Sequence, residues 1–216
     1  MTGRLITFEG TEGCGKSTQL RLLADRLQAD GLPVVGVREP GGTPIGEEIR
    51  HTLQHSDRNQ AMTPEAELLL INASRAQLVR EIIRPALARG TVVLCDRFYD
   101  STTAYQAYGR GLDVAQVRQV IDLAVGPTRP DLTLLLRVPA EIGEARRRRR
   151  PGVASVRDRM EEAGTRFFAT VVTGFDRIAA AEPSRIRVID GTRPIPEVAA
   201  AVWDAVRPIL PGDQPR

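Results

Sequence analysis

The sequence has a single lysine, Lys16, although lysine and arginine together number 30 among 216 residues. Its two cysteines, Cys14 and Cys95, are too few for the disulfide framework of a small secreted domain. Aromatic residues make up only 4% of the chain, which leaves little to stack on the bases of single-stranded nucleic acid. The apolar runs are too short for a membrane span or an export signal, so we expect a cytoplasmic protein without a membrane partner.

Charge is nearly balanced, with a formal net charge of +3 and an isoelectric point near 9.3. This balance suits an anionic small molecule at least as well as a nucleic acid. The only two histidines, His51 and His55, have the spacing of one helix face, which allows a metal site, but two surface side chains are the simpler interpretation. The length predicts one domain, which we place over residues 1–210. The last six residues, PGDQPR at 211–216, are typical of a disordered tail.

Five short apolar runs alternate with longer helical patterns. The runs are too continuous in apolar residues for a half-exposed sheet, and such runs are typical of parallel strands covered by helices on both faces. They lie at Leu5–Glu9, Val34–Glu39, Thr91–Asp96, Leu132–Val138 and Arg185–Asp190. The alternation predicts an α/β fold with a five-stranded parallel sheet, in which ligands bind beyond the carboxyl ends of the strands.

The stretch around the only lysine fits the phosphate-binding pattern G-x-x-x-x-G-K-[ST], directly between a predicted strand and a predicted helix. In such a P-loop, backbone N–H groups hold phosphate oxygens, the lysine reaches the β- and γ-phosphates and the hydroxyl binds Mg²⁺. Lysine suits this place because it is a compact charge on a flexible stem. The alternative is a glycine-rich turn with an incidental lysine. We expect ATP to bind at Gly10, Thr11, Glu12, Gly13, Cys14, Gly15, Lys16, Ser17 and Thr18.

The string VVLCDR places Asp96 at the end of an apolar strand. A carboxylate there is expected to hold Mg²⁺ together with Ser17, although a plain strand-end aspartate is the alternative. The next residue is Arg97, whereas many ATPases have a glutamate that activates water. An arginine here favours a second anionic substrate, so we predict a phosphotransferase that keeps water out of its site.

Five consecutive arginines, Arg146–Arg150, are followed by Arg157 and Arg159. Such a run is commonly a solvated basic face or a nucleic-acid patch. A third interpretation is a lid over about residues 146–160 that closes over ATP. We favour the lid, because the P-loop contains no arginine and phosphoryl transfer needs positive charge around the transferred group.

Six strings together resemble the thymidylate kinase family over nearly the whole chain. They are FEGTEGCGKSTQ, REPGGTPIGEEIR (Arg38–Arg50), NASRAQLV (Asn72–Val79), DRFYDSTTAYQAYGRG (Asp96–Gly111), RPDLTLLL (Arg129–Leu136) and DRME (Asp158–Glu161). The strings EPGGT and DR-x-x-x-S-x-x-AYQ are specific in combination. The resemblance implies the P-loop nucleoside monophosphate kinase fold with a small lid, phosphorylation of dTMP to dTDP with ATP and Mg²⁺ in dTTP synthesis, no nucleic-acid partner, and a homodimer.

The resemblance also implies a role for individual residues. Lys16, Arg97, Glu12 and a lid arginine would form the catalytic group, and the DRME match selects Arg159. Arg97 would grip the dTMP phosphate, and Glu12 would lie near the sugar 3′-OH. The other substrate-binding residues would be Glu39 in the acceptor pocket, Arg50 near the phosphate, Arg75, Thr102 and Gln106 at the thymine edge, and Tyr105 where a ribose 2′-OH would intrude.

Two positions depart from the family pattern or leave an interpretation open. Ile71 stands where family members commonly place a phenylalanine that stacks on thymine, and an aliphatic side chain makes a weaker contact with the ring. Cys14 lies at a helix N-terminus, which lowers a thiol pKa, so a redox role stays open beside that of a small filler. The alternatives for function are a kinase of another nucleoside monophosphate, such as dUMP or dCMP, and a basic nucleic-acid-binding protein.

Overall fold

The computed structural model describes residues 3–56, 58–149 and 164–210. The predicted tail at 211–216 and the part of the predicted lid beyond residue 149 lie outside these ranges, so the domain limits stay a prediction. Five strands form one parallel sheet in the order β2-β3-β1-β4-β5. They are β1 (Arg4–Glu9), β2 (Val34–Arg38), β3 (Val92–Asp96), β4 (Leu132–Arg137) and β5 (Ile186–Asp190), each within one residue of its predicted limits.

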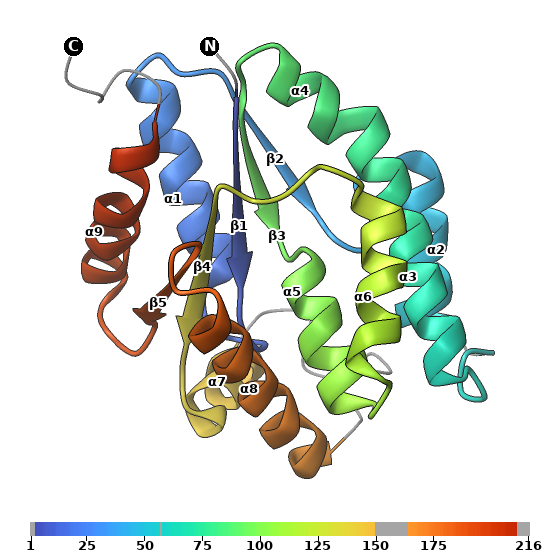
Figure 1. Ribbon diagram of the computed structural model, residues 1–216. Coiled ribbons are helices and arrows are strands. Elements are labelled where there is room, and N and C mark those ends of the chain that lie inside the picture. The colour runs from blue at the N-terminus through green and yellow to red at the C-terminus, as the bar shows by residue number, and fades with distance from the viewer. Residues whose placement is uncertain (1–2, 57, 150–163, 211–216) are drawn as a thin grey trace.

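Both faces of the sheet are apolar, which is why the strands read as continuous apolar runs. On one face, Ile6 and Leu94 pack against helices α1 (Lys16–Ala29) and α9 (Ile195–Val206). On the other face, Leu5 and Val93 pack against α3 (Pro64–Leu78) and α6 (Val114–Val125). Figure 1 shows α1 and α9 on one side of the strands and α3 and α6 on the other.

The remaining helices complete these layers. The helix α2 (Pro44–Gln54) packs against α3, which continues through a π-helical turn, η1 (Val79–Ile83), into α4 (Arg84–Ala88). The short α5 (Tyr99–Thr102) continues into the π-helical η2 (Thr103–Gly109), which packs against α8 (Gly164–Ala181). The helix α7 (Ala140–Arg148) follows β4, and a 3₁₀ turn, η4 (Arg207–Ile209), follows α9. Within the described ranges, no helix has both the length and the apolar character to cross a membrane.

The local sequence explains where several helices begin. Thr43 and Thr63 each accept a hydrogen bond from the backbone N–H three residues later, and each is followed by a proline at the first helical position. Asp113 caps α6 in the same way. These are the side chains that best satisfy the free N–H groups of a first helical turn. The arrows of β1, β3 and β4 in Figure 1 point toward α5, α7 and α8, so the carboxyl ends of these strands face these helices.

Candidate active site

The predicted P-loop lies between β1 and α1 and needs its glycines for two physical reasons. Gly10 and Gly13 have φ angles of 130° and 70°, which side chains other than glycine rarely adopt. A Cβ at Gly10 would lie 2.3 Å from the Leu136 carbonyl oxygen, and one at Gly13 would lie 2.1 Å from the Gly143 oxygen. The loop therefore curls tightly and packs against both β4 and α7.

Lys16 and Ser17 begin α1 at the end of this loop. The Lys16 ammonium is folded over the loop, where it donates to the carbonyl oxygens of Gly10 and Thr11 at 3.0 Å each. The Ser17 hydroxyl donates to Asp96 Oδ2 at 2.8 Å, so the two residues expected to bind Mg²⁺ are in contact. A hydroxyl and a carboxylate fit Mg²⁺, because this ion takes a few protein oxygens and fills its other positions with water and phosphate.

Arg97 follows β3 directly and has a φ of 69°, the one positive φ outside glycine in the described part of the chain. A residue in this region carries a strain of about 1–3 kcal/mol, which the surrounding contacts must offset. Its guanidinium donates to the Gly10 oxygen at 3.0 Å and to Ser101 Oγ at 2.9 Å. It also lies 3.9 Å from the Glu12 carboxylate and 5.2 Å from the centre of the Tyr105 ring.

Electrostatics keep Arg97 charged. Burial alone would lower its pKa, but nearby acidic groups outweigh this effect and raise the pKa above its usual value. These groups belong to Tyr105, Glu12, Asp96 and Glu9. Arg97 thus places a permanent positive charge beside the P-loop, as its predicted role at a phosphate requires.

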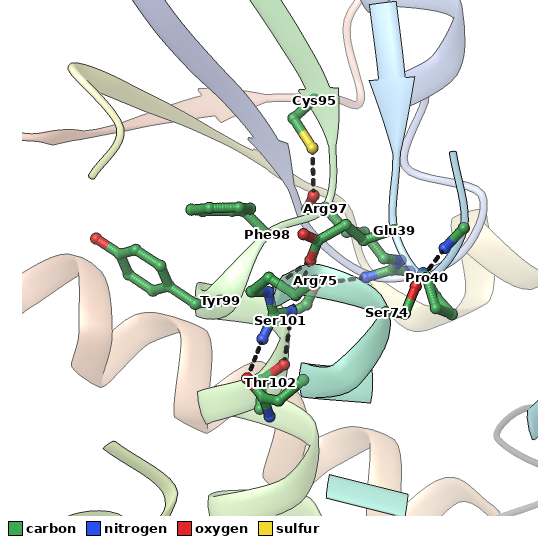
Figure 2. Close-up of polar contacts among 12 residues, drawn as sticks. Glu39, Pro40, Ser74, Arg75, Cys95, Arg97, Phe98, Tyr99, Ser101 and Thr102 are labelled. Carbon is green, nitrogen blue, oxygen red and sulfur yellow. Dashed lines mark hydrogen bonds and ion pairs between the residues drawn. The ribbon is translucent and has the colours of Figure 1, made fainter. Parts of the chain in front are cut away.

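A second cluster brings together three of the residues predicted for the acceptor pocket (Figure 2). The Arg75 side chain is 1% exposed and donates through Nε to Glu39 Oε2 at 2.7 Å. Its other two nitrogens donate to Asn72 Oδ1 at 2.8 Å and to Thr102 Oγ1 at 2.9 Å. Burial raises the Glu39 pKa, and the Arg75 charge opposes that rise. Glu39 Oε1 is buried and has no hydrogen-bond partner among the described residues, so this oxygen can accept a bond from a ligand.

Gln106 also lies in the protein interior, at 1% exposure. Its amide donates to the buried Glu67 carboxylate at 2.8 Å, and Arg110 binds the same carboxylate at 3.0 Å. Glu67 therefore sets the orientation of the Gln106 amide. Of the predicted base-edge residues, Arg75 and Thr102 bond to each other, whereas Gln106 is held by Glu67, a partner that the sequence interpretation did not name.

Three further predicted residues lie next to members of this cluster: Ile71 precedes Asn72 on α3, Tyr105 in η2 follows Thr102, and Arg50 bonds the residue after Glu39. Ile71 is 7% exposed, yet it belongs to none of the three apolar core clusters formed by the described residues. Tyr105 packs edge-on against Phe167 and Phe175, and burial raises the pKa of its hydroxyl. Arg50 reaches back from α2 and donates to the Pro40 oxygen at 2.9 Å, which holds it on the EPGGT turn.

The arginine run is only partly described. Arg146 donates to the Gly191 oxygen at 2.8 Å, while Arg147 and Arg148 both bind Glu144, each at 2.9 Å. These hydrogen bonds lower the Glu144 pKa to about 2. Arg159, the arginine predicted to be catalytic, lies outside the described residues, as do Arg150 and Arg157, so its role stays a prediction.

A cavity of about 1040 Å³ opens between the P-loop, α7, α8 and the end of β5. Thr11 and Glu12 line it from the P-loop, and Arg147 and Arg148 line it from α7. Phe168 and Val172 of α8 are among the apolar residues that line its wall. The cavity thus joins the predicted phosphate-binding loop to the helix that carries the first arginines of the run.

Comparison with known proteins agrees with this geometry. A family model described as Thymidylate kinase matches residues 8–202. The thymidylate kinase of Synechococcus sp. (strain JA-3-3Ab) is 50% identical over 212 residues, which cover 98% of this chain and 98% of that protein. The thymidylate kinase of Pseudomonas fluorescens (strain SBW25) is 50% identical over 210 residues and 97% of each chain.

Among solved structures, the thymidylate kinase from Ehrlichia chaffeensis aligns with a TM-score of 0.76 and 33% identity, over 96% of this chain and 99% of that one. The predicted P-loop nucleoside monophosphate kinase fold is therefore confirmed. These matches extend over nearly the whole chain, and the chain belongs to the thymidylate kinase family.

Proposed function

We propose that the protein phosphorylates dTMP to dTDP with ATP and Mg²⁺, as a step in dTTP synthesis, and that the residues described above perform the transfer. One observation carries the residue assignment: Arg97 contacts the P-loop on one side and the Tyr105 ring on the other. A single charged side chain thus lies between the predicted ATP site and the predicted acceptor pocket.

On the donor side, the P-loop N–H groups hold the ATP phosphates, and Lys16 exchanges the carbonyl oxygens of Gly10 and Thr11 for phosphate oxygens. Ser17 and Asp96 hold Mg²⁺, which offsets the charge on the β- and γ-phosphates when it is bound. Arg159 adds positive charge around the transferred group from the lid. Its contribution is expected mainly in kcat, because the contact forms in the transition state.

On the acceptor side, Arg97 binds the dTMP phosphate, with Arg50 close to it. Glu12, which lines the cavity, accepts from the sugar 3′-OH. The ring of Tyr105, fixed between Phe167 and Phe175, occupies the space that a ribose 2′-OH would need.

The thymine edge is read by the Arg75, Glu39 and Thr102 cluster. Hydrogen bonds to a buried, pre-oriented guanidinium discriminate well, because a base without the matching group leaves buried polar atoms unpaired. Gln106, whose amide is held by Glu67, also bonds the base edge, and Ile71 covers the face of the thymine ring. Cys14 is 1% exposed, which favours its interpretation as a small filler in the loop over a redox role.

A homodimer fits one exposed surface. Leu69 of α3 is 58% exposed and Leu123 of α6 is 79% exposed, and these two helices pack side by side. Apolar side chains of this size are commonly buried between subunits. We place the protein in the cytoplasm and expect neither nucleic acid nor membrane as a partner.

The test is a coupled assay of ADP release with dTMP, dUMP, dCMP and the ribose analogue of dTMP as acceptors. The proposal expects the highest kcat/KM for dTMP. A higher kcat/KM for dUMP or dCMP would identify that monophosphate as the preferred acceptor in place of dTMP. Salt-dependent DNA binding without turnover of any monophosphate would favour the nucleic-acid-binding alternative.

A further inference from the structure

Glu9, the last residue of β1, is a fully buried carboxylate that the proposed mechanism does not use. Its Oε1 accepts from the backbone N–H groups of Phe98 at 2.8 Å and Ser101 at 3.2 Å. Its Oε2 accepts from the Ser101 hydroxyl at 2.5 Å. All three donors belong to the turn that starts α5 directly after Arg97.

The hydrogen bonds of this turn run in one direction. Arg97 donates to Ser101 Oγ at 2.9 Å, so the single hydroxyl proton of Ser101 is left for Glu9. Above its pKa of about 7, Glu9 is ionised and only accepts hydrogen bonds, so it can end this series of donors. An amide cannot: a glutamine that turned its oxygen to the two backbone N–H groups would turn its NH₂ group to Ser101.

The other side of the same helix is held independently. Asp100 forms a buried ion pair with Arg185 at 2.8 and 2.9 Å, and Thr133 donates to the same carboxylate at 3.2 Å. The backbone of α5 is therefore fixed by Asp100 as well, while Ser101, which Glu9 holds, is the residue of α5 that bonds the Arg97 guanidinium.

We propose that Glu9 is a positioning residue: acting through Ser101, it fixes the guanidinium of Arg97 against the P-loop. The inference rests on the proposed function of Arg97 at the acceptor phosphate. Glu9 needs no contact with substrate for this role. Because Arg97 has a left-handed backbone, no regular helical geometry directs its side chain, and the hydrogen bonds to Ser101 and Gly10 do so instead.

The first test compares Glu9→Gln, Ser101→Ala and the control Thr7→Val in the full chain. Thr7 lies on the same strand and is fully buried, but its hydroxyl contacts Thr133 at 2.7 Å and not the Arg97 turn. We expect the first two variants to lower kcat/KM for dTMP at least about tenfold with the KM for ATP within about twofold, since misplacement of a contact group costs rate. Thr7→Val should keep wild-type kinetics.

A double-mutant cycle separates positioning from general stability. In an Arg97→Ala background, Glu9→Gln should cause no further loss of kcat/KM, because the group it positions is gone. Full additivity of the two losses would overturn the inference, and so would wild-type kcat/KM in a folded Glu9→Gln variant. If Glu9→Gln does not fold, Ser101→Ala takes its place in the cycle.

A crystal structure of Ser101→Ala gives a readout that does not need turnover. The inference expects the Arg97 guanidinium to leave the Gly10 oxygen, and an unchanged position would overturn it. Failure of the proposed function would be seen differently, as a wild-type chain that turns over no dTMP.

Discussion

The buried pair of Glu39 and Arg75 offers a sharp test, because its two roles, in stability and in base recognition, can be separated. Both side chains are at most 2% exposed, and Glu39 carries the one carboxylate that pairs with Arg75 among the described residues. Glu39→Gln keeps the shape of the side chain but leaves the Arg75 charge uncompensated inside the protein. Removing one partner of a buried pair costs about 3–5 kcal/mol of folding free energy.

The assay is urea unfolding of the protein without ligands. The matched control is Asp176→Asn, which breaks the pair between Arg137 and Asp176, whose side chains are 53% and 38% exposed. Exposed pairs contribute about 0–1 kcal/mol, so the control should barely move the midpoint. Equal losses for Glu39→Gln and Asp176→Asn would refute the reasoning.

A double variant then separates stability from recognition. Glu39→Leu combined with Arg75→Met replaces both charges with apolar side chains, so most of the lost stability should return. Turnover of dTMP should not return, because the guanidinium of Arg75 and the carboxylate of Glu39, which bond the base edge, are both gone. Recovery of dTMP turnover in this folded variant would remove Arg75 from base recognition.

The remaining predictions use the same assays. Lys16→Ala should lower kcat at least about 10²-fold with an unchanged circular dichroism spectrum, because the ammonium stabilises charge in the transition state; near-normal turnover would contradict the P-loop assignment. Tyr105→Ala should narrow the ratio of kcat/KM between dTMP and its ribose analogue, and an unchanged ratio would exclude the steric role. Ile71→Phe should tighten dTMP by about 0.5–1.5 kcal/mol if Ile71 lines the pocket, whereas a core position would be overpacked, with an unfolding free energy about 1–3 kcal/mol lower. Burial, reinforced by the charge of Asp100 and opposed by Ser101, Arg97 and Phe98, raises the Glu9 pKa from 4.5 to about 7. The native state therefore binds this proton more tightly than the unfolded state, so the free energy of unfolding should fall by about 3 kcal/mol at most as pH rises from 4.5 to 7. This fall should be missing in Glu9→Gln.

The fold was predictable because the composition of each strand reflects how deeply both of its faces are buried. A run such as Val92–Asp96 is apolar at consecutive positions because helices cover both faces, and this burial pattern is visible without any knowledge of the partners. The P-loop was equally visible, since the positive φ angles of Gly10 and Gly13 and their close approach to neighbouring backbone restrict those positions to glycine.

The candidate site was only partly predictable. Glu39, Arg75 and Thr102 come from three separate elements, and their grouping followed from resemblance to a family and not from the spacing of the residues. Glu67 and Asp100 were missed because an acidic residue in a helix is ordinarily exposed. What buries them is a tertiary partner distant in sequence, such as Arg185 for Asp100.

The spacing inside the family strings nevertheless has a physical origin in this structure. In DR-x-x-x-S, the left-handed backbone of Arg97 precedes the start of α5, and this turn brings the Arg97 guanidinium to the Ser101 hydroxyl in the first turn of the helix. In NASR, Asn72 and Arg75 are three residues apart on α3, the spacing at which two side chains meet across one helical turn, and Arg75 donates to Asn72. Each string therefore specifies one local contact that orients an arginine. The carboxylates that complete these contacts come from distant strand ends, and only the folded chain reveals them: Glu39 bonds Arg75 directly, and Glu9 bonds Ser101, the partner of Arg97.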